Sequence, residues 1–467
     1  MQPETMMHRR NLLQSFSGLA GIALLDLLNA GKVVANPKAK AKRAIQISLV
    51  GGLSHLDSFD YKPELTKMHG KTLKMDHAPD IFFGQIGRLR QSDFAFQQHG
   101  NSGLWLSNLF PNIAKHADKL TVIRSMFSET ANHTPGLFLL NSGFGFNGYP
   151  SLGSWLSYGM GAITDELPTY VVLPDGRGDP TGGASNWTSG FLPSVHQGVA
   201  FQSGNQPVQD LHPRQAVPAS QELAAKELLG KLNQQYGASH PMEDPLLSRI
   251  ASYQLAAKMQ LAIPKVADLS QEDEKTKQAY GIHNKATQDC GIRCLLARRL
   301  LEKGTRYIQI YSGGPIGGSP RTSWDAHENV KTNHQAEAER IDQPIAALLH
   351  DLHNRGLLED TLVLFTTEFG RTPFAQSAAN VVGTGRDHNR YGFSCWMAGA
   401  GLKPGIAYGT TDNVGWKAAE NPVSWHDFHA TVLHLLGLDH EKLTFYHNGI
   451  QRRLTNVHGE LVKGILG

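Results

Sequence analysis

Cysteine is scarce in this chain of 467 residues, and its scarcity excludes several kinds of protein. The cysteines are Cys290, Cys294 and Cys395, so the sequence predicts neither a disulfide framework nor a zinc site built from paired cysteines. Cys290 and Cys294 lie four residues apart in "DCGIRCLLARRLLEKG", on one face of an expected helix. We expect them to be two buried thiols and Cys395 to lie in a buried strand.

Charged residues are also few, at 18% of the chain, while hydrophobic residues make up 40%, which is typical of a folded protein. The formal net charge of +3 is misleading. Residues 1–43 contain seven basic and two acidic side chains, a surplus of +5, so the rest of the chain carries a net charge of −2. A mildly acidic body has no general electrostatic attraction for nucleic acid, and we expect no nucleic-acid partner.

Long apolar runs are missing as well. The N-terminal segment "HRRNLLQSFSGLAGIALLDLL" is short and contains an acidic residue, which argues against a stable membrane span. It places Arg9 and Arg10 before the apolar stretch, and the small residue Ala35 follows as a cleavage site, so it resembles a twin-arginine export signal. An ordinary amphipathic helix is the alternative. We expect residues 1–43 to be an export signal and linker that direct the protein to the periplasm or the cell exterior.

Six short apolar runs without alternation predict strands that are covered on both faces, and hence a largely parallel sheet. Helical patterns lie between several of them, and two end at Gly304 and Gly356. This alternation predicts an α/β fold over residues 44–467, a three-layer sandwich with a mostly parallel central sheet. Residues 221–280 break the alternation and predict a helical insertion that covers either an active site or a partner surface. The six runs are 45–50, 119–126, 168–174, 306–314, 361–370 and 393–401.

Polar side chains gather where these expected strands end, which is where open α/β sheets bind their ligands. Metal ions held there by carboxylates and imidazoles can clamp an attacking and a leaving oxygen. Each of these side chains taken alone could have a purely structural role, such as helix capping by Asp325. A sheet without a binding site, however, does not need so many polar side chains at successive strand ends. The candidates are His55, Asp57, Thr130, Asn132, His133, Thr134, Asp325, His327, Glu368, Arg371, Arg386 and His388.

Six motifs occur in order along the chain: "GGLSHLDSFDYKP", "RSMFSETANHTPGLFLLNSG", "WDAHEN", "TEFGRTP", "GRDHN" and "HDFHATVLHLLGLD". Together they resemble the bacterial family called domain of unknown function 1501, which is similar to the alkaline phosphatase and sulfatase superfamily. The resemblance covers essentially the whole chain after residue 43. It implies an alkaline-phosphatase-like fold, divalent metal ions at the carboxyl end of the sheet, and a nucleophile at the start of the helix after the second strand.

The nucleophile position departs from the pattern of the relatives. Where sulfatases have Cys-x-Pro-x-Arg, this chain aligns His133, Pro135 and Leu137, so we do not expect a conventional sulfatase. Phosphatases of the superfamily use Ser or Thr, which leaves Thr134 or Thr130 as the nucleophile once a metal lowers its pKa. His133 itself is open between three roles: metal ligand, nucleophile and structural link.

The metal-binding segments depart as well. Gly51 and Gly52 stand where relatives place the first acid, so Asp57 follows several residues later. Glu368 is followed by Phe369 where relatives have a histidine or an asparagine. A single-metal or weakened two-metal site is therefore as consistent with the sequence as a full one. The ligands implied for zinc, calcium or manganese are His55, Asp57, Asp325, His327, Glu368 and His388.

Two hypotheses of function follow. The first is an exported, metal-dependent hydrolase of phosphate esters, with sulfate esters as the weaker alternative and a small molecule or a polysaccharide as the substrate. Arg371, Arg386 and Asn132 are its expected substrate contacts, because guanidinium suits phosphate and sulfate oxygens. The second is a catalytically degenerate relative that binds an anionic or carbohydrate ligand, which the residue at Phe369 and the absent sulfatase nucleophile motif both suggest.

Overall fold

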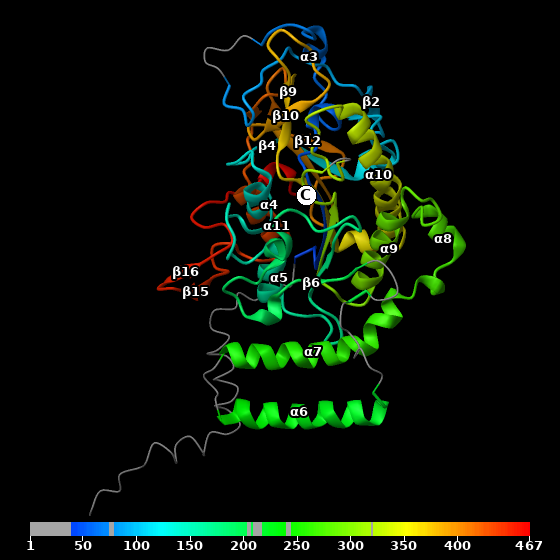
Figure 1. Cartoon of the computed structure of the whole chain (residues 1–467), viewed down its shortest axis with the longest axis vertical. Helices are drawn as coiled ribbons and strands as arrows, with labels where there is room; N and C mark the ends of the chain where they lie inside the picture. The colour runs from blue at the N-terminus through cyan, green and yellow to red at the C-terminus, as the bar shows by residue number, and fades with distance from the viewer. Residues whose placement is uncertain (1–38, 74–78, 203–206, 209–216, 240–243, 319–320) are drawn as a thin grey trace, which may run out of the picture.

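The structure, a computed structural model, describes residues 39–73, 79–202, 207–208, 217–239, 244–318 and 321–467. Residues 1–38, which contain most of the expected export signal, lie outside the described residues, and export stays a prediction. An eight-stranded sheet in the order β12-β4-β11-β8-β1-β7-β5-β6 forms the centre of the fold (Figure 1). Its strands are β1 (Arg43–Leu49), β4 (Leu120–Met126), β5 (Tyr170–Leu173), β6 (Val199–Ala200), β7 (Tyr307–Ser312), β8 (Thr361–Thr367), β11 (Phe393–Gly399) and β12 (Ile406–Tyr408).

The sheet is mostly parallel, as the sequence predicts. Strand β1 pairs in parallel with both β7 and β8, and β5 continues the same direction beside β7 and β6. Strand β11 is antiparallel to both β8 and β4, and β12 runs parallel to β4. Seven strands therefore run one way and β11 alone opposes them. All six predicted strands are present, so the carboxyl ends of most strands share one edge.

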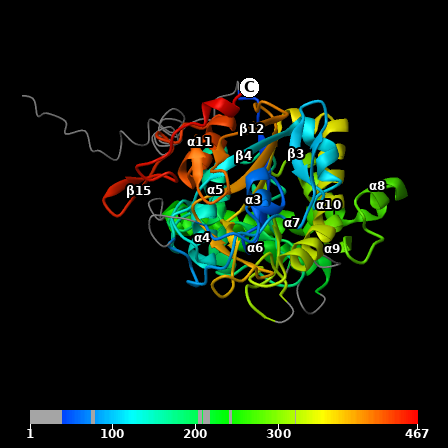
Figure 2. The same cartoon turned by 90° about the horizontal axis from the view of Figure 1, so that it is seen from above.

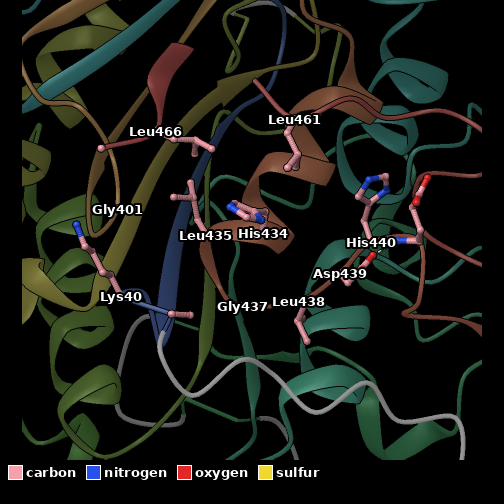
Figure 3. Close-up of a pocket in the computed structure, with 13 residues that line it drawn as sticks. Lys40, Gly401, His434, Leu435, Gly437, Leu438, Asp439, His440, Leu461 and Leu466 are labelled. Atoms are coloured by element: carbon pink, nitrogen blue, oxygen red, sulfur yellow. Dashed lines mark hydrogen bonds between the residues drawn. The ribbon is translucent and has the colours of Figure 1, made fainter. Parts of the chain in front are cut away.

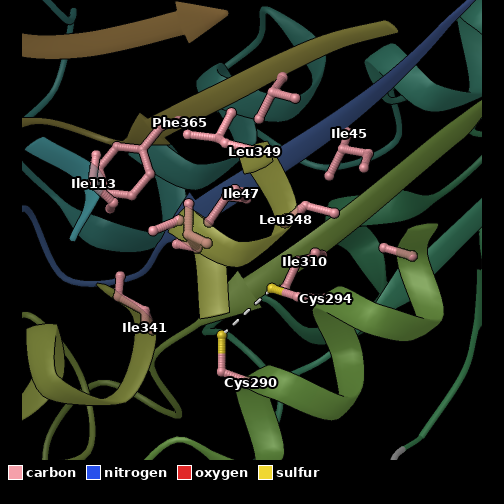
Figure 4. Packing of buried hydrophobic residues seen from close by; sticks show 14 of the residues in the cluster. Ile45, Ile47, Ile113, Cys290, Cys294, Ile310, Ile341, Leu348, Leu349 and Phe365 are labelled. Atoms are coloured by element: carbon pink, nitrogen blue, oxygen red, sulfur yellow. Dashed lines mark hydrogen bonds between the residues drawn. The ribbon is translucent and has the colours of Figure 1, made fainter. Parts of the chain in front are cut away.

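Helices cover both faces of the sheet and complete the three layers (Figures 1 and 2). On one face, Ile45 and Ile47 of β1 belong to the same buried cluster as Leu348 of α10 (Figure 4). On the other face, Ala44 packs in a second cluster with residues of α4, α5 and α11. This alternation along β1 buries each strand on both sides, and each buried aliphatic side chain contributes about 1.5–3 kcal/mol. The helices are α4 (His133–Ser142), α5 (Leu152–Met160), α9 (Gln288–Glu302), α10 (Val330–Asn354) and α11 (Trp425–Leu435).

Local sequence signals explain two details of these helices. A capping box formed by Ser424 and Asp427 opens α11. Cys290 and Cys294 face the core from one side of α9 as free thiols with their sulfurs 3.8 Å apart, which confirms the prediction of two buried thiols (Figure 4).

The segment for which the sequence predicts a helical insertion contains α6 (Ala219–Ser239), α7 (Asp244–Ala267) and α8 (Glu274–Ala279). In Figure 1, α6 and α7 lie at the opposite end of the molecule from β9 (Gly370–Ala375) and β10 (Arg386–Asn389). The insertion therefore does not cover the strand ends that carry the candidate site. Each helix within the described residues is too short or too polar to span a membrane.

Small elements complete the described fold. The short helix α3 (Pro63–Lys67) follows the turn after β1. Two-stranded sheets join β2 (Phe96–His99) with β3 (Leu104–Ser107), β9 with β10, β13 (Thr410–Thr411) with β14 (Ala418–Glu420), and β15 (Phe445–His447) with β16 (Ile450–Arg452). The candidate residues Arg386 and His388 lie in strand β10 itself, which pairs with β9.

Candidate metal centre

Four side chains from three parts of the chain converge at the carboxyl edge of the sheet. His133, Asp325, His327 and His388 each offer one ligand atom, and these atoms all lie within 4.8 Å of one another. His133 opens α4, directly after the segment that leaves β4, and His388 lies in β10. The Nε2 atoms of His133, His327 and His388 lie 3.3, 2.7 and 3.3 Å from Oδ1 of Asp325.

Each of the three imidazoles is held from its other nitrogen by an oxygen acceptor. The acceptors of the Nδ1 hydrogens are Glu368 Oε1 for His133 at 2.7 Å, Gln376 Oε1 for His327 at 2.5 Å, and the Ala131 carbonyl for His388 at 2.6 Å. A carboxylate, an amide oxygen and a carbonyl can only accept, so Nδ1 carries the proton in each ring. Every Nε2 therefore presents a lone pair to the same point, as in metal-binding histidines.

The residues fit a bound divalent ion. Three lone pairs and a carboxylate oxygen repel one another unless a cation or protons lie between them. Nε2 of His133 is buried and makes no hydrogen bond. In a tetrahedral zinc site with bonds of 2.0–2.1 Å, neighbouring ligand atoms are about 3.3 Å apart, close to the separations found around Asp325. The cluster can therefore hold a metal ion.

The charges in this cluster depend on one another. Burial raises the pKa of Asp325, but in the metal-free centre the interactions with protonated forms of the three imidazoles and the charge of Arg371 outweigh burial and hold that pKa well below its usual range. Burial lowers the pKa of His388 well below its usual value, so this imidazole stays neutral. For His133 burial also lowers the pKa, but Asp325 and Glu368 raise it further than burial lowers it. A proton on His133 thus competes with a metal for the same carboxylate oxygen.

The glycine turn after β1 supports the cluster without providing a ligand. The Gly51 N–H donates to Glu368 Oε1 at 2.8 Å, the oxygen that also accepts from His133. Gly51 has a φ of +119°, and a Cβ there would lie 2.4 Å from the backbone nitrogen of Asp325, so only glycine fits. Arg371 donates to the Gly52 carbonyl and to Asp325 Oδ1, each at 2.8 Å. The glycine turn after β1 and the loop that carries Asp325 therefore stabilise each other's position.

Asp57 and His55 lie outside this cluster. Both are buried in the short 3-10 helix His55–Asp57, and His55 donates from Nε2 to the Gly415 carbonyl at 2.9 Å. Asp57 Oδ2 accepts from Arg386 Nε at 2.9 Å and from Ser54 at 2.5 Å. Burial raises the pKa of Asp57, but Arg386 and Ser54 outweigh it and lower the pKa to about 2. Asp57 therefore forms a fully buried ion pair with Arg386.

The two candidate arginines are enclosed by protein oxygens. Arg371 and Arg386 are both fully buried. Arg386 also donates to the carbonyls of Thr372, Arg90 and Gln91, each at 3.0 Å. Both arginines therefore stabilise the loops around the cluster through these hydrogen bonds.

The candidate nucleophiles lie at the start of α4. Thr134 directly follows the ligand candidate His133, is half-buried, and shares a 2.8 Å hydrogen bond with the hydroxyl of Thr181. Thr130 accepts from the backbone N–H of Asn132 at 3.1 Å, and Asn132 is the exposed residue that precedes the helix. Thr134 is therefore the candidate hydroxyl next to a cluster residue.

Sequence reasoning misses the apolar rim of the site. Phe82 and Phe83 expose 45% and 53% of their surfaces, yet their rings lie 4.9 Å from His388 and 4.8 Å from His327. The Phe83 N–H donates to Asp387 Oδ2 at 2.9 Å, which fixes the segment beside the cluster. Gln376 is missed too, because a lone amide in the bend directly after β9 gives no periodic or motif signal.

A cavity of about 590 Å³ lies elsewhere, lined by residues that include Lys40, His434, Asp439 and His440 (Figure 3). Lys40 precedes β1, so the cavity is at the amino end of that strand, whereas the cluster is beyond its carboxyl end. No candidate site residue lines it.

The sequence pattern of a family described as "Protein of unknown function (DUF1501)" matches residues 41–466, and the chain belongs to that family. No curated protein matches the sequence closely enough to count as a relative.

Solved structures show a distant likeness. The PsFucS1 sulfatase from Pseudoalteromonas sp. is 14% identical with a TM-score of 0.35, over 94% of this chain and 75% of that one. The lipoteichoic acid synthase LtaP from Listeria monocytogenes is 10% identical with a TM-score of 0.36, over 88% and 78%. An alkaline phosphatase superfamily protein from Vibrio parahaemolyticus is 10% identical with a TM-score of 0.33, over 91% and 77%. With identities and scores this low, family membership rests on the matched residues 41–466 alone.

Proposed function

With membership of the DUF1501 family as the premise, we propose that this chain is an exported hydrolase of phosphate esters that depends on one divalent metal ion. The observation that carries the proposal is the convergence of three Nε2 atoms on Asp325 Oδ1, with every imidazole fixed at Nδ1. A divalent ion held there would supply Lewis-acid stabilisation of the negative charge that develops on an ester oxygen.

A single ion fits better than two, because the other candidate carboxylates already have partners. Asp57 is neutralised by Arg386, and Glu368 accepts from both Gly51 and His133. Three imidazoles and one carboxylate favour zinc or a similar transition metal, with manganese next, because calcium takes oxygen ligands.

Thr134 is the protein group best placed to attack the ester, and a water molecule is the alternative. It lies in the first turn of α4, where backbone N–H groups have no helical acceptor and favour the negative oxygens of a phosphoryl group. Its hydrogen bond with Thr181 fixes the direction of its hydroxyl. The exposed rings of Phe82 and Phe83 would contact the organic part of the substrate, either a small molecule or a polysaccharide.

Export belongs to the same proposal. Arg9 and Arg10 before a short apolar segment support a twin-arginine signal, and that route carries proteins already folded. The metal would then be loaded before export, and the protein would act in the periplasm or outside the cell. Sulfate esters are the weaker substrate class, because the sulfatase nucleophile motif is replaced at His133 and Leu137.

A second candidate function is a metal-containing binding protein for an anionic or carbohydrate ligand. Four protein ligands complete a tetrahedral shell, whereas catalytic zinc sites usually have three and leave one position open. The candidate arginines for anion binding also face protein oxygens. On this alternative the metal holds the loops together and no ester is cleaved.

The deciding experiment compares metal content with turnover. Full-length protein is expressed with zinc, manganese and calcium available, and is assayed against aryl phosphate, phosphodiester and aryl sulfate substrates. We expect phosphate-ester turnover that is lost in Thr134→Val while the metal stays bound, with Thr130→Val as the matched control that keeps activity. Metal-loaded protein without turnover on any substrate would favour the binding function.

A further inference from the structure

Two adjacent phenylalanines project from the segment that borders the metal cluster. Phe82 and Phe83 lie in "IFFGQI", residues 81–86, and expose 45% and 53% of their surfaces. On either side of them, Ile81 and Ile86 pack against a separate cluster of buried apolar side chains. The segment is therefore anchored at both ends while its two largest side chains reach the surface. A pair of exposed rings held in this way indicates a contact surface, whereas exposed apolar residues scattered singly are ordinary.

The two rings lie directly against the imidazoles of the candidate ligands. The ring centroid of Phe82 is 4.9 Å from that of His388, and the centroid of Phe83 is 4.8 Å from that of His327. The two phenyl rings also contact each other edge to face, with their centroids 4.8 Å apart. A ligand that covers the rings with one end therefore has its other end beside the metal ligands.

Three polar side chains near the rings already have partners within the protein. Asp80 accepts from Arg390 at 2.8 Å and from the hydroxyl of Tyr391 at 3.0 Å. Asp387 accepts from two backbone N–H groups at 2.9 and 2.7 Å, and Gln376 accepts from an imidazole of the cluster. A sugar on the rings would need polar groups that are free to bind its hydroxyls, because burying a hydroxyl without a hydrogen bond is costly. The surroundings of the rings therefore favour an apolar occupant.

We propose that Phe82 and Phe83 bind an alkyl chain of the substrate, so that the ester is an amphiphile with a phosphate head and an apolar tail. This inference rests on the proposed function, because it takes the metal centre as the site of the phosphoryl group. The anionic head complements a cation held by the imidazoles, and the tail covers the two exposed rings. Each methylene that contacts the rings leaves water, so affinity rises with the length of the chain.

Binding of alkylphosphonates tests this surface without turnover, because a phosphonate has a P–C bond in place of the ester bond. Isothermal titration calorimetry compares ethylphosphonate with hexylphosphonate on the metal-loaded, full-length protein. We expect hexylphosphonate to bind about tenfold more tightly, since its four additional methylenes, each about half-covered by the rings, are worth roughly this factor. The double variant Phe82→Ser and Phe83→Ser should abolish the preference. Phe146→Ser is the control that keeps it, because Phe146 is 59% exposed and follows the end of α4 remote from His133.

Hydrolysis of ethyl phosphate and hexyl phosphate separates this inference from the proposed function. If neither ester is cleaved but hexylphosphonate binds more tightly, the hydrolase proposal fails and the alkyl-binding surface stands. If hexylphosphonate binds no more tightly than ethylphosphonate, the alkyl-binding surface is overturned, whether or not the esters are cleaved. Sedimentation with phosphatidylcholine vesicles in that case would assign the rings to a membrane contact. A preference that survives in the double variant, or tighter binding of glucose 6-phosphate than of hexylphosphonate, overturns the inference as well.

Discussion

His133 and Glu368, 235 positions apart in the sequence, are joined by a 2.7 Å hydrogen bond from Nδ1 to Oε1. This bond sets the tautomer of His133 and turns its Nε2 toward Asp325. The same Glu368 oxygen accepts from the Gly51 N–H, so one carboxylate at the end of β8 links the turn after β1 to α4. Glu368 therefore acts on the centre by positioning a ligand.

Replacing Glu368 should weaken metal binding without removing a ligand. In Glu368→Gln the acceptor of the His133 hydrogen bond loses its charge. Mutation of the hydrogen-bond partner of a metal-binding histidine typically weakens metal affinity by about 10–100-fold. Competition with a chromogenic chelator measures the change, and Glu359→Gln, on the exposed surface, is the matched control. An affinity equal to that of the wild type would show that the bond is structurally incidental.

Gly51→Ala should be costly, because a Cβ would lie 2.4 Å from the nitrogen of Asp325 at a φ of +119°. We expect the free energy of unfolding to fall by at least about 2 kcal/mol in urea titrations. Gly70→Ala is the control, since Gly70 also has a positive φ, +75°, but nothing within 4 Å. Backbone strain alone should cost about 1 kcal/mol there. Equal losses in the two variants would contradict the close approach to Asp325.

The variant Asp57→Asn distinguishes two roles of Asp57, that of a metal ligand and that of the ion-pair partner of Arg386. Removing the charge leaves Arg386 buried and uncompensated, so we expect about 3–5 kcal/mol of destabilisation. The metal content of the folded variant should not change. If the variant keeps its stability and loses its metal, Asp57 is a ligand, as the sequence predicts.

Acid should destabilise the protein partly through His429. This side chain is fully buried and donates to the Leu140 carbonyl at 2.8 Å, and burial lowers its pKa from 6.5 to about 3. The unfolded chain takes up a proton below about pH 6.5 and the folded chain does not, so stability falls as the pH falls. This histidine should account for about 1 kcal/mol between pH 6.5 and 5.5. Urea titrations of His429→Gln should show a slope against pH that is smaller by this amount, and an identical slope would refute the assignment.

The sheet is readable from the sequence because strands buried on both faces leave continuous apolar runs, as in residues 45–50 and 361–370. The same strand ends point to Asp325 and His388. The role of each candidate side chain is harder to predict. The sequence shows that a carboxylate follows a strand, but it does not show which cation or hydrogen-bond donor neutralises that carboxylate in the fold. Asp57 pairs with Arg386, 329 positions later, and no local pattern signals that pairing.

The most direct test of the central claim is X-ray absorption spectroscopy on the full-length protein loaded with zinc, alongside its metal content. We expect one ion per chain, with imidazole nitrogens and a carboxylate oxygen at about 2.0–2.1 Å, and loss of that ion in Asp325→Ala. A protein without stoichiometric metal, or an ion surrounded only by oxygen, would contradict the three-histidine centre.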